Sequence, residues 1–219
     1  MSTEGVCTPA RQGRWTKQER RAQVAAVTLE IIAREGVRAA TLARIAGAAG
    51  IAAPSLYNHF SGRTEILESA ADLLLERVFA WIDSSTNPNM LERLRELGGT
   101  MHESRIAGNQ EWVITPLLEF VVAARAEELT EPMGRNQLRV LQRFIDIVEA
   151  GKRQGSIRDD TDPRVVGWSL MGLGWTKDFA LLQGLDQFIT DGTADSILDN
   201  VLDRIAAKPR MPTSGQDVE

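Results

Sequence analysis

The sequence predicts an all-α fold, and three observations carry this prediction. Apolar residues recur at spacings of three and four along most of the 219 residues, which is the period of an amphipathic helix. We find no convincing alternation of apolar and polar residues bounded by hairpin turns, so strand signals are nearly absent. Glycine, proline and short polar residues interrupt the helical pattern at intervals that suit helix ends.

The composition is that of an ordinary globular protein, with 43% hydrophobic and 25% charged residues. No apolar run reaches the roughly 18 residues of a membrane helix, and the N-terminus lacks the apolar stretch of a secretory signal. Cys7 is the single cysteine, which excludes an internal disulfide or a thiolate cluster within one chain. We therefore expect a cytoplasmic protein without a membrane partner.

The first helix is predicted over residues 16–35, with Val24, Val27 and Ile31 on its apolar stripe. Gly36 follows as a residue that can adopt the left-handed conformation at a helix end. Thr41 is placed to cap a second, short helix, and Gly50 interrupts it.

The third helix is predicted to have Pro54 in its first turn and to end at Ser61-Gly62. Leu56 and Phe60, four residues apart, should face inward. Thr64 is then expected to cap the helix that follows. The two short helices, joined by small residues and braced by a longer one, form a helix-turn-helix pattern.

The remaining helices are predicted at 64–84, 90–107, 110–129, 133–154, 162–184 and 194–207. Pro116 should kink the third of these, and Asp162 with Pro163 should cap and begin the fifth. We divide the chain into a flexible basic arm (1–15), a helix-turn-helix domain (16–63), a helical effector-binding and dimerisation domain (64–207) and a disordered tail (208–219).

Charge is distributed unevenly between these parts. Residues 1–63 hold nine Lys/Arg and four Asp/Glu, a net charge of +5, whereas the remainder holds sixteen and twenty-six, a net charge of −10. A basic N-terminal part on an acidic body indicates that the former meets a polyanion.

The helix-turn-helix pattern points to double-stranded DNA as that polyanion, because a recognition helix reads base edges with its N-terminal residues. Ser and Asn can hydrogen-bond to bases, and small apolar side chains can touch a thymine methyl group. Tyr57, His59 and Arg63 look better placed to contact phosphates. Tyr57 as a packing residue is the alternative.

The stretch TLARIAGAAGIAAPSLYNHFSGRTEIL, residues 41–67, resembles the TetR family of bacterial transcriptional regulators. The resemblance is close over about residues 16–70 and loose beyond. It implies an all-α homodimer with a three-helix DNA-binding head, linked by the fourth helix to a ligand-binding body. The dimer would pair the helices near 162–184 and 194–207.

The resemblance also implies roles for individual residues. Family members contact phosphates at the positions of Thr41, Tyr57, His59 and Arg63, and Arg44 is a further expected contact. They meet bases at the positions of Ala53, Pro54 and Ser55. The complete set of expected DNA-binding residues is Thr41, Arg44, Ala53, Pro54, Ser55, Tyr57, Asn58, His59 and Arg63.

The chain departs from the family pattern at two positions. Ala52 stands where a capping Ser or Thr is common, and Arg44 stands where many members carry an acid. Both departures bear on operator preference. The basic arm is expected either to lay Arg11 or Arg14 into a minor groove or to stay solvated.

The body is rich in large apolar side chains that as a set suit an effector cavity, although each one alone is more typical of plain core. His102, Arg105, Thr115 and Glu119 are the polar groups expected to orient a ligand. The complete set of candidates is Trp81, Met101, His102, Arg105, Trp112, Thr115, Glu119, Phe120, Phe144, Trp168, Met171 and Trp175.

The function predicted from these features is that of a ligand-responsive transcriptional repressor, released from a palindromic operator by a small lipophilic effector. We expect no cofactor and no metal, because His59 and His102 are the only histidines and no carboxylates accompany His59 at ligand spacing. Nucleophile and phosphate-loop motifs are missing, so no enzyme is expected. A helical small-molecule enzyme and a non-specific DNA-binding protein are the alternatives.

Overall fold

The structure, a computed structural model, describes residues 15–104 and 110–207; for residues 100–104 and 110–114 it describes the backbone alone. These residues form α1 (Lys17–Glu35), the 3-10 turn η1 (Val37–Ala39), α2 (Leu42–Ala48), α3 (Ala53–Leu56), α4 (Arg63–Ile82), α5 (Met90–Ser104), α6 (Gln110–Ala123), α7 (Thr130–Gln154), α8 (Pro163–Leu182), α9 (Gln187–Thr190) and α10 (Thr193–Ile205). Strand pairing in this part of the chain is limited to one antiparallel bridge, between Ile157 and Ala206. The all-α prediction is confirmed.

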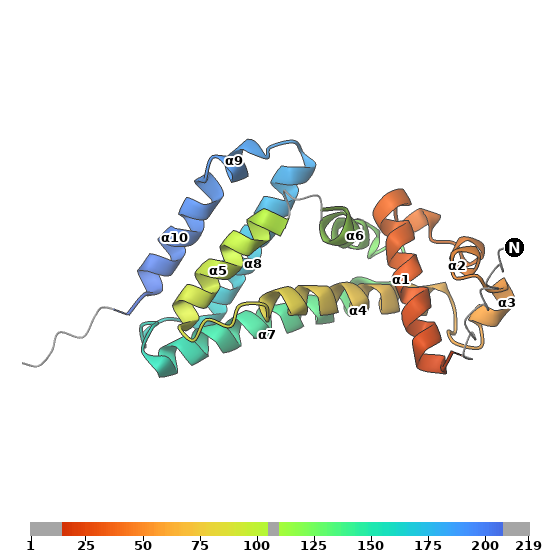
Figure 1. Ribbon diagram of the computed structural model, residues 1–219, viewed down its shortest axis with the longest axis horizontal. Helices are drawn as coiled ribbons and strands as arrows, with labels where there is room; N and C mark the ends of the chain where they lie inside the picture. Colours follow the sequence, from red (N-terminus) through yellow and green to blue (C-terminus); the bar gives the residue numbers. More distant parts are fainter. Residues whose placement is uncertain (1–14, 105–109, 208–219) are drawn as a thin grey trace, which may run out of the picture.

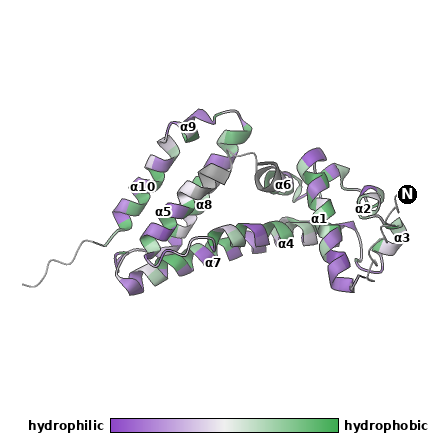
Figure 2. Ribbon diagram, in the orientation of Figure 1, coloured by the Kyte–Doolittle hydropathy of each residue, from purple (hydrophilic) through white to green (hydrophobic). Residues whose placement is uncertain are grey.

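The molecule is elongated, with a head at one end and a helical body at the other (Figure 1). The head consists of α1, α2 and α3, and α4 runs from it into the body alongside α7. The helices α5, α8 and α10 lie at the far end, and α6 lies between them and the head. Hydrophobic and hydrophilic residues both occur along each long helix (Figure 2), as expected of helices that bury one face.

α1 begins and ends with local signals that the sequence carries. The Thr16 side chain accepts from the Glu19 amide, and the Glu19 carboxylate accepts from the Thr16 amide at 2.7 Å, which is a reciprocal capping box. Gly36 ends the helix with φ +83°, a backbone conformation that residues with a Cβ rarely adopt. The predicted stop at Gly36 is confirmed.

The turn between α2 and α3 depends on Gly50, whose φ of +67° again favours glycine. Leu56 and Phe60 are buried at 1% and 3% exposure, which confirms that they face inward. The helix itself is shorter than predicted. It ends at Leu56, and Tyr57 and Asn58 continue as turn residues whose amides donate to carbonyls three residues earlier.

The expectation that Thr64 caps α4 is wrong. Gly62 occupies the N-cap position without a side-chain hydrogen bond, and Glu65 in the first turn binds the residue that precedes this cap instead. Its carboxylate accepts from the Ser61 amide at 2.6 Å and from the Ser61 hydroxyl at 2.9 Å. The same carboxylate pairs with Arg21 of α1 at 2.7 Å.

Arg21 links three parts of the head. Its guanidinium donates to the His59 main-chain carbonyl, pairs with Glu65, and lies 4.3 Å from the centre of the Phe60 ring. The turn after α3 is therefore held to α1 and to the start of α4 at once. We call Arg21, Glu65 and Ser61 the head clamp.

The body differs from the predicted boundaries in two places. α6 ends at Ala123 and α7 begins at Thr130, with turn residues 124–128 between them. The short helix α9 was not predicted. The predicted end of the helix over 90–107 lies outside the described residues. The predicted cap of α8 is confirmed, because the Asp162 carboxylate accepts from the Arg164 amide at 2.8 Å.

Two hydrophobic clusters meet within α4. The first joins the head to residues Ile66–Leu74 of α4, to Phe120 of α6, to Leu129 just before α7 and to Met133 of α7. The second begins at Leu75 and contains the side chains of α5, α7, α8 and α10. The head core thus extends into α4 and α6, past residue 63.

The head clamp generates a prediction about pH. Hydrogen bonds from the Ser61 amide, the Arg21 side chain and the Ser61 hydroxyl lower the pKa of Glu65 from 4.5 to about 2. Because the folded-state pKa is depressed, the contribution of Glu65 to stability is complete above pH 4.5 and is lost as the pH falls toward 2. The destabilisation caused by Glu65→Gln should therefore shrink over that range.

Urea unfolding of the wild type and the variant at several pH values measures this difference. Glu68→Gln on the same helix is the matched control, because the described residues give Glu68 no hydrogen bond or ion pair. A destabilisation by Glu65→Gln that stays constant from neutral to acid pH would contradict the role of the clamp.

Candidate nucleic-acid interface and cavity

The outer face of the turn-and-helix segment around α3 carries the expected base-reading residues. Pro54 and Asn58 are exposed, and Tyr57 is 61% exposed. Ala53, Ser55 and His59 are half-buried on the same short segment. The 61% exposure of Tyr57 makes a pure packing role untenable in this subunit. The segment presents hydroxyl, amide and small apolar groups, which suit the edges of bases and a thymine methyl group.

The second helix contributes a cap and a compensated charge. The Thr41 hydroxyl accepts from the Arg44 amide at 3.2 Å, so Thr41 caps α2 as expected. The exposed Arg44 guanidinium pairs with Glu35 of α1 at 2.6 Å. Glu35 raises the pKa of Arg44 through a hydrogen bond and its charge. Arg44 thus brings a paired charge to this surface.

Arg63 occupies a different environment from the one expected of a phosphate contact. Its Nε donates to the Ala40 carbonyl at 2.8 Å and its Nη2 donates to the Val37 carbonyl at 2.7 Å. Its Nη1 pairs with Glu127, in the turn after α6. The side chain is only 25% exposed. The structure therefore places Arg63 at the contact between head and body, with its donors directed at protein acceptors.

Glu119 joins the same contact from α6. Its carboxylate accepts from the Val37 amide at 3.0 Å, and it lies so near Gly36 that an added Cβ would be 3.0 Å from its Oε2. The turn η1 is thereby held by α6 through Glu119 and by the start of α4 through Arg63, which Glu127 pairs with in turn. We call Arg63, Glu119, Glu127 and Val37 the junction. Sequence reasoning had assigned Glu119 to an effector and overlooked Glu127.

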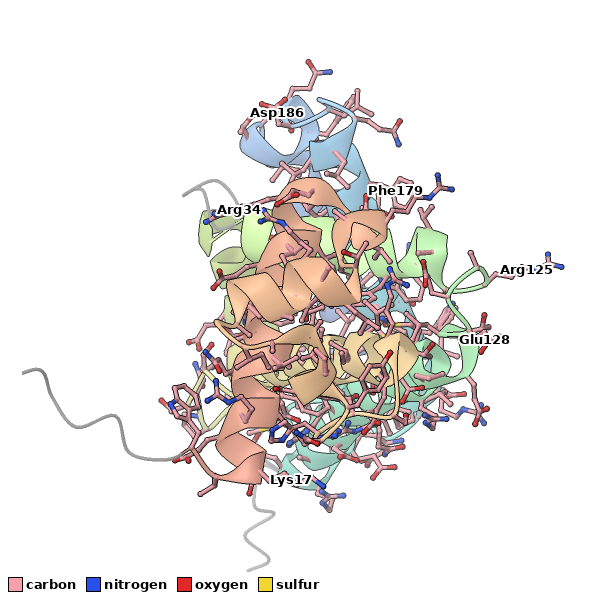
Figure 3. The ribbon with its side chains drawn as sticks, turned by 90° about the vertical axis from the view of Figure 1, so that its right-hand side faces the viewer. Lys17, Arg34, Arg125, Glu128, Phe179 and Asp186 are labelled. Atoms are coloured by element: carbon pink, nitrogen blue, oxygen red, sulfur yellow. The ribbon has the colours of Figure 1, made fainter. Side chains whose placement is uncertain are left out.

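Figure 3 looks onto the head and shows which charges lie outside the junction. Lys17 and Arg34 mark the two ends of α1. Arg125 and Glu128 project outward from the turn after α6, on the same turn that supplies Glu127 inward. Arg11, Arg14 and Cys7 lie outside the described residues.

A small cavity lies in the body between α4, α5, α7, α8 and α10. Its volume is about 30 Å³. Trp81 and Phe144 line it, and their ring centroids are 6.5 Å apart in an edge-on arrangement. Two of the expected effector residues are thus brought together at one cavity.

The other expected effector residues are scattered. Phe120 is fully buried in the cluster under the head, because the head core extends into α6, and it does not line the cavity. Met171 is buried in the body cluster. Thr115 is half-buried on α6. Met101, His102, Arg105 and Trp112 lie outside the residues whose side chains are described.

Two tryptophans lie together on α8. Trp168 is 57% exposed and packs edge-on against Trp175, with centroids 5.4 Å apart. A side chain so exposed lies on the surface of the subunit and does not line an interior cavity. The helical period placed Trp168 among buried residues because α8 is apolar on more than one face.

Lys177 is the charged residue of the cavity lining, and the sequence did not lead us to expect it there. It is 2% exposed and lines the cavity together with leucines from α5, α8 and α10. A signal was available, because Lys177 is the only Lys or Arg between Arg164 and Arg204 and stands within an apolar helix.

Other kinds of site find little support in the described part of the chain. There, no three His, Cys, Asp or Glu side chains gather to hold a metal ion. None of the helices in residues 15–104 and 110–207 is long and apolar enough to cross a membrane.

Comparisons with known sequences agree with the head geometry. Residues 25–70 match the family model of bacterial regulatory proteins of the tetR family. An HTH-type transcriptional repressor KstR2 of Mycobacterium tuberculosis is 29% identical over 162 residues, covering 72% of this chain and 79% of the relative. The repressor of the same name from Rhodococcus jostii is 27% identical over 195 residues, covering 87% and 93%.

Solved structures share the fold along most of the chain. A TetR-family transcriptional regulator from Rhodococcus sp. aligns with a TM-score of 0.71 at 21% identity, over 87% of this chain and 100% of that one. The ketosteroid transcriptional regulator KstR2 of Mycobacterium tuberculosis aligns with a TM-score of 0.52 at 22% identity, over 86% and 96%. Residues 25–70 therefore carry the DNA-binding domain of the TetR family of bacterial transcriptional regulators, and the chain shares its fold with solved members of that family over most of its length.

Proposed function

We propose that this protein is a cytoplasmic, homodimeric repressor that binds a pseudo-palindromic DNA operator and leaves it when a small lipophilic effector enters the body. Its relatives carry the name of transcriptional repressors. Two heads related by a two-fold axis would present their α3 segments to successive major grooves, about 34–36 Å apart or a multiple of that distance.

The observation that carries this proposal is the exposed α3 segment on a rigid support. Tyr57, Asn58 and Pro54 point away from the head core, while the head clamp holds the turn that follows them. Base readout needs such pre-positioned groups, because each immobilised side chain otherwise costs binding free energy. Ser55 and Asn58 would read bases, and Thr41, Tyr57 and His59 would contact phosphates.

The junction supports a route from effector to DNA. α4 begins at Arg63 in the head and reaches the cavity at Trp81, and α6 holds η1 through Glu119. An effector that favours a different arrangement of these helices would change the spacing of the two heads. It would lower DNA affinity by the ratio of its affinities for the two states.

An exposed apolar surface supports the dimer. Val165, Trp168, Phe179 and Leu182 of α8 are each at least half exposed, and Ile197 of α10 is 48% exposed. Apolar surface of this kind on a soluble subunit marks an interaction site. Its position on α8 and α10 agrees with the helices expected to pair in the dimer.

Selection of bound sequences from a random DNA pool, with purified protein at near-physiological salt, tests the proposed function. We expect a two-fold-symmetric motif. Enrichment of no motif, with an affinity that is steep in salt and indifferent to sequence, would favour a non-specific DNA-binding protein instead.

Repeating the selection with Ser55→Ala tests the assignment of base contacts. We expect the base preference to change at one position of each half-site. The discrimination against the wrong base that is lost there should be about 1–3 kcal/mol. Tyr57→Phe is the matched comparison, because loss of a phosphate contact should weaken all sequences alike. An unchanged motif with Ser55→Ala would show that Ser55 reads no base.

Leu182→Arg with Phe179→Arg tests the dimer surface. Burying two new charges at the α8 interface should give monomers in analytical ultracentrifugation. Operator affinity should fall by roughly 100-fold or more, because the two heads no longer bind as one unit. Val122→Arg is the control, since Val122 is 84% exposed on α6, away from α8 and α10. A dimer that survives the α8 substitutions would place the interface elsewhere.

A further inference from the structure

Lys177 of α8 is a buried ammonium group at an apolar cavity. The residue is 2% exposed, and its Nζ donates to the Asp195 carboxylate of α10 at 2.8 Å. An ammonium group carries three N–H donors. Among the described residues, Asp195 is the one acceptor that the structure gives it. Lys177 therefore has donor capacity that the described protein groups leave unused.

Burial of such a group is costly unless its donors and its charge are satisfied. Asp195 offsets the cost of burying the Lys177 charge only in part. Its side chain is 41% exposed, so solvent screens its attraction for the ammonium group. A carboxylate supplied from the cavity side could take over as counter-ion, and Asp195 would then turn to solvent. Charge-assisted hydrogen bonds of this kind are roughly twice as strong as neutral ones.

The remaining lining of the cavity is apolar. Trp81 and Phe144 face it from α4 and α7, and leucines face it from α5, α8 and α10. Such a lining suits a hydrocarbon or aromatic body, while one polar group fixes its orientation. The cavity thus offers the two kinds of contact that an amphiphilic molecule needs.

We propose that the body binds lipophilic carboxylic acids, with the carboxylate accepting from Lys177 Nζ and the apolar body lying against Trp81 and Phe144. This inference rests on the proposed function only where it takes the acid to be the effector. Binding of the acid at this site does not require that the protein binds DNA. Lys177 is the residue that selects acids over neutral and cationic molecules of the same shape.

The size of the cavity adds a consequence. A volume of about 30 Å³ holds roughly two water molecules, so an acid enters by displacing packed side chains. α5 and α10 touch closely here, because a Cβ on Gly98 would lie 1.9 Å from Leu198 Cδ2. Separation of α5 from α10 at Leu198 is the rearrangement that makes room.

Isothermal titration of the full chain with matched probes tests the proposal. The probes are decanoate and phenylbutyrate, the methyl ester of each, and the amines decylamine and phenylbutylamine. We expect the acids to bind roughly tenfold or more tightly than their esters and amines. Amines that bind as tightly as the acids, or acids that do not bind at all, would overturn the proposal.

Two substitutions act in opposite directions. Lys177→Met should abolish the preference for acids and leave ester binding unchanged, since the apolar lining remains. Asp195→Asn keeps Lys177 and removes its competing carboxylate, so acid binding should strengthen severalfold. Should Lys177→Met fail to fold, Asp195→Asn still tests the proposal. Unchanged or weaker acid binding by Asp195→Asn would contradict the idea that the acid replaces Asp195 as the counter-ion of Lys177.

Lys152→Met is the matched control. Lys152 also lies in the body, but its Nζ donates to the Thr161 carbonyl at 2.6 Å, away from the cavity lining. Its loss should leave the preference for acids intact. A symmetric DNA motif without acid binding would uphold the proposed function and overturn this inference, whereas acid binding without DNA release would uphold the site and overturn its role as the effector site.

Discussion

The arrangement of head and body depends on the Arg63 guanidinium. One planar group at the start of α4 donates to the carbonyls of Val37 and Ala40 and pairs with Glu127. Arginine suits this task because its donors form a rigid fork that can serve several acceptors at once. The Val37 carbonyl, which also accepts from the Ala40 amide, and the Ala40 carbonyl are thereby tied to α4, and the body gains a direct contact with the head through Glu127.

The consequence of this contact is that the helix-turn-helix unit does not end where its sequence motif ends. Phe120, Leu129 and Met133 from the body complete the core of the head, and Glu119 holds the Val37 amide. A displacement of α6 therefore acts on η1, and η1 leads directly into α2. The surface offered to DNA is positioned by the head clamp on one side and by the junction on the other.

Local signals made the fold and the head predictable from the sequence. Gly36, Gly50 and Asp162 act within a few residues of their own positions, so their roles could be inferred without a structure. Contacts between residues that are distant in the sequence could not be inferred in this way. Glu65 rather than Thr64 fixes the start of α4 because Arg21 and Ser61 both bind its carboxylate, and no sequence period reveals that contact.

The candidate sites show the same division. The exposed residues around α3 follow from the motif, whereas the environment of Arg63 follows from a turn more than sixty residues away. Among the apolar residues of the body, helical periodicity does not distinguish core, cavity and exposed apolar surface. Phe120 lies in the core, Trp81 lines the cavity and Trp168 is exposed.

We infer that Arg63 acts through the junction rather than on DNA. Operator affinity measured against salt concentration for Arg63→Gln and Glu127→Gln tests it most directly. We expect both variants to weaken binding with an unchanged salt slope, because each loosens the same contact. Stronger binding by Glu127→Gln, with a slope reduced by about one for Arg63→Gln, would show instead that Arg63 neutralises a phosphate.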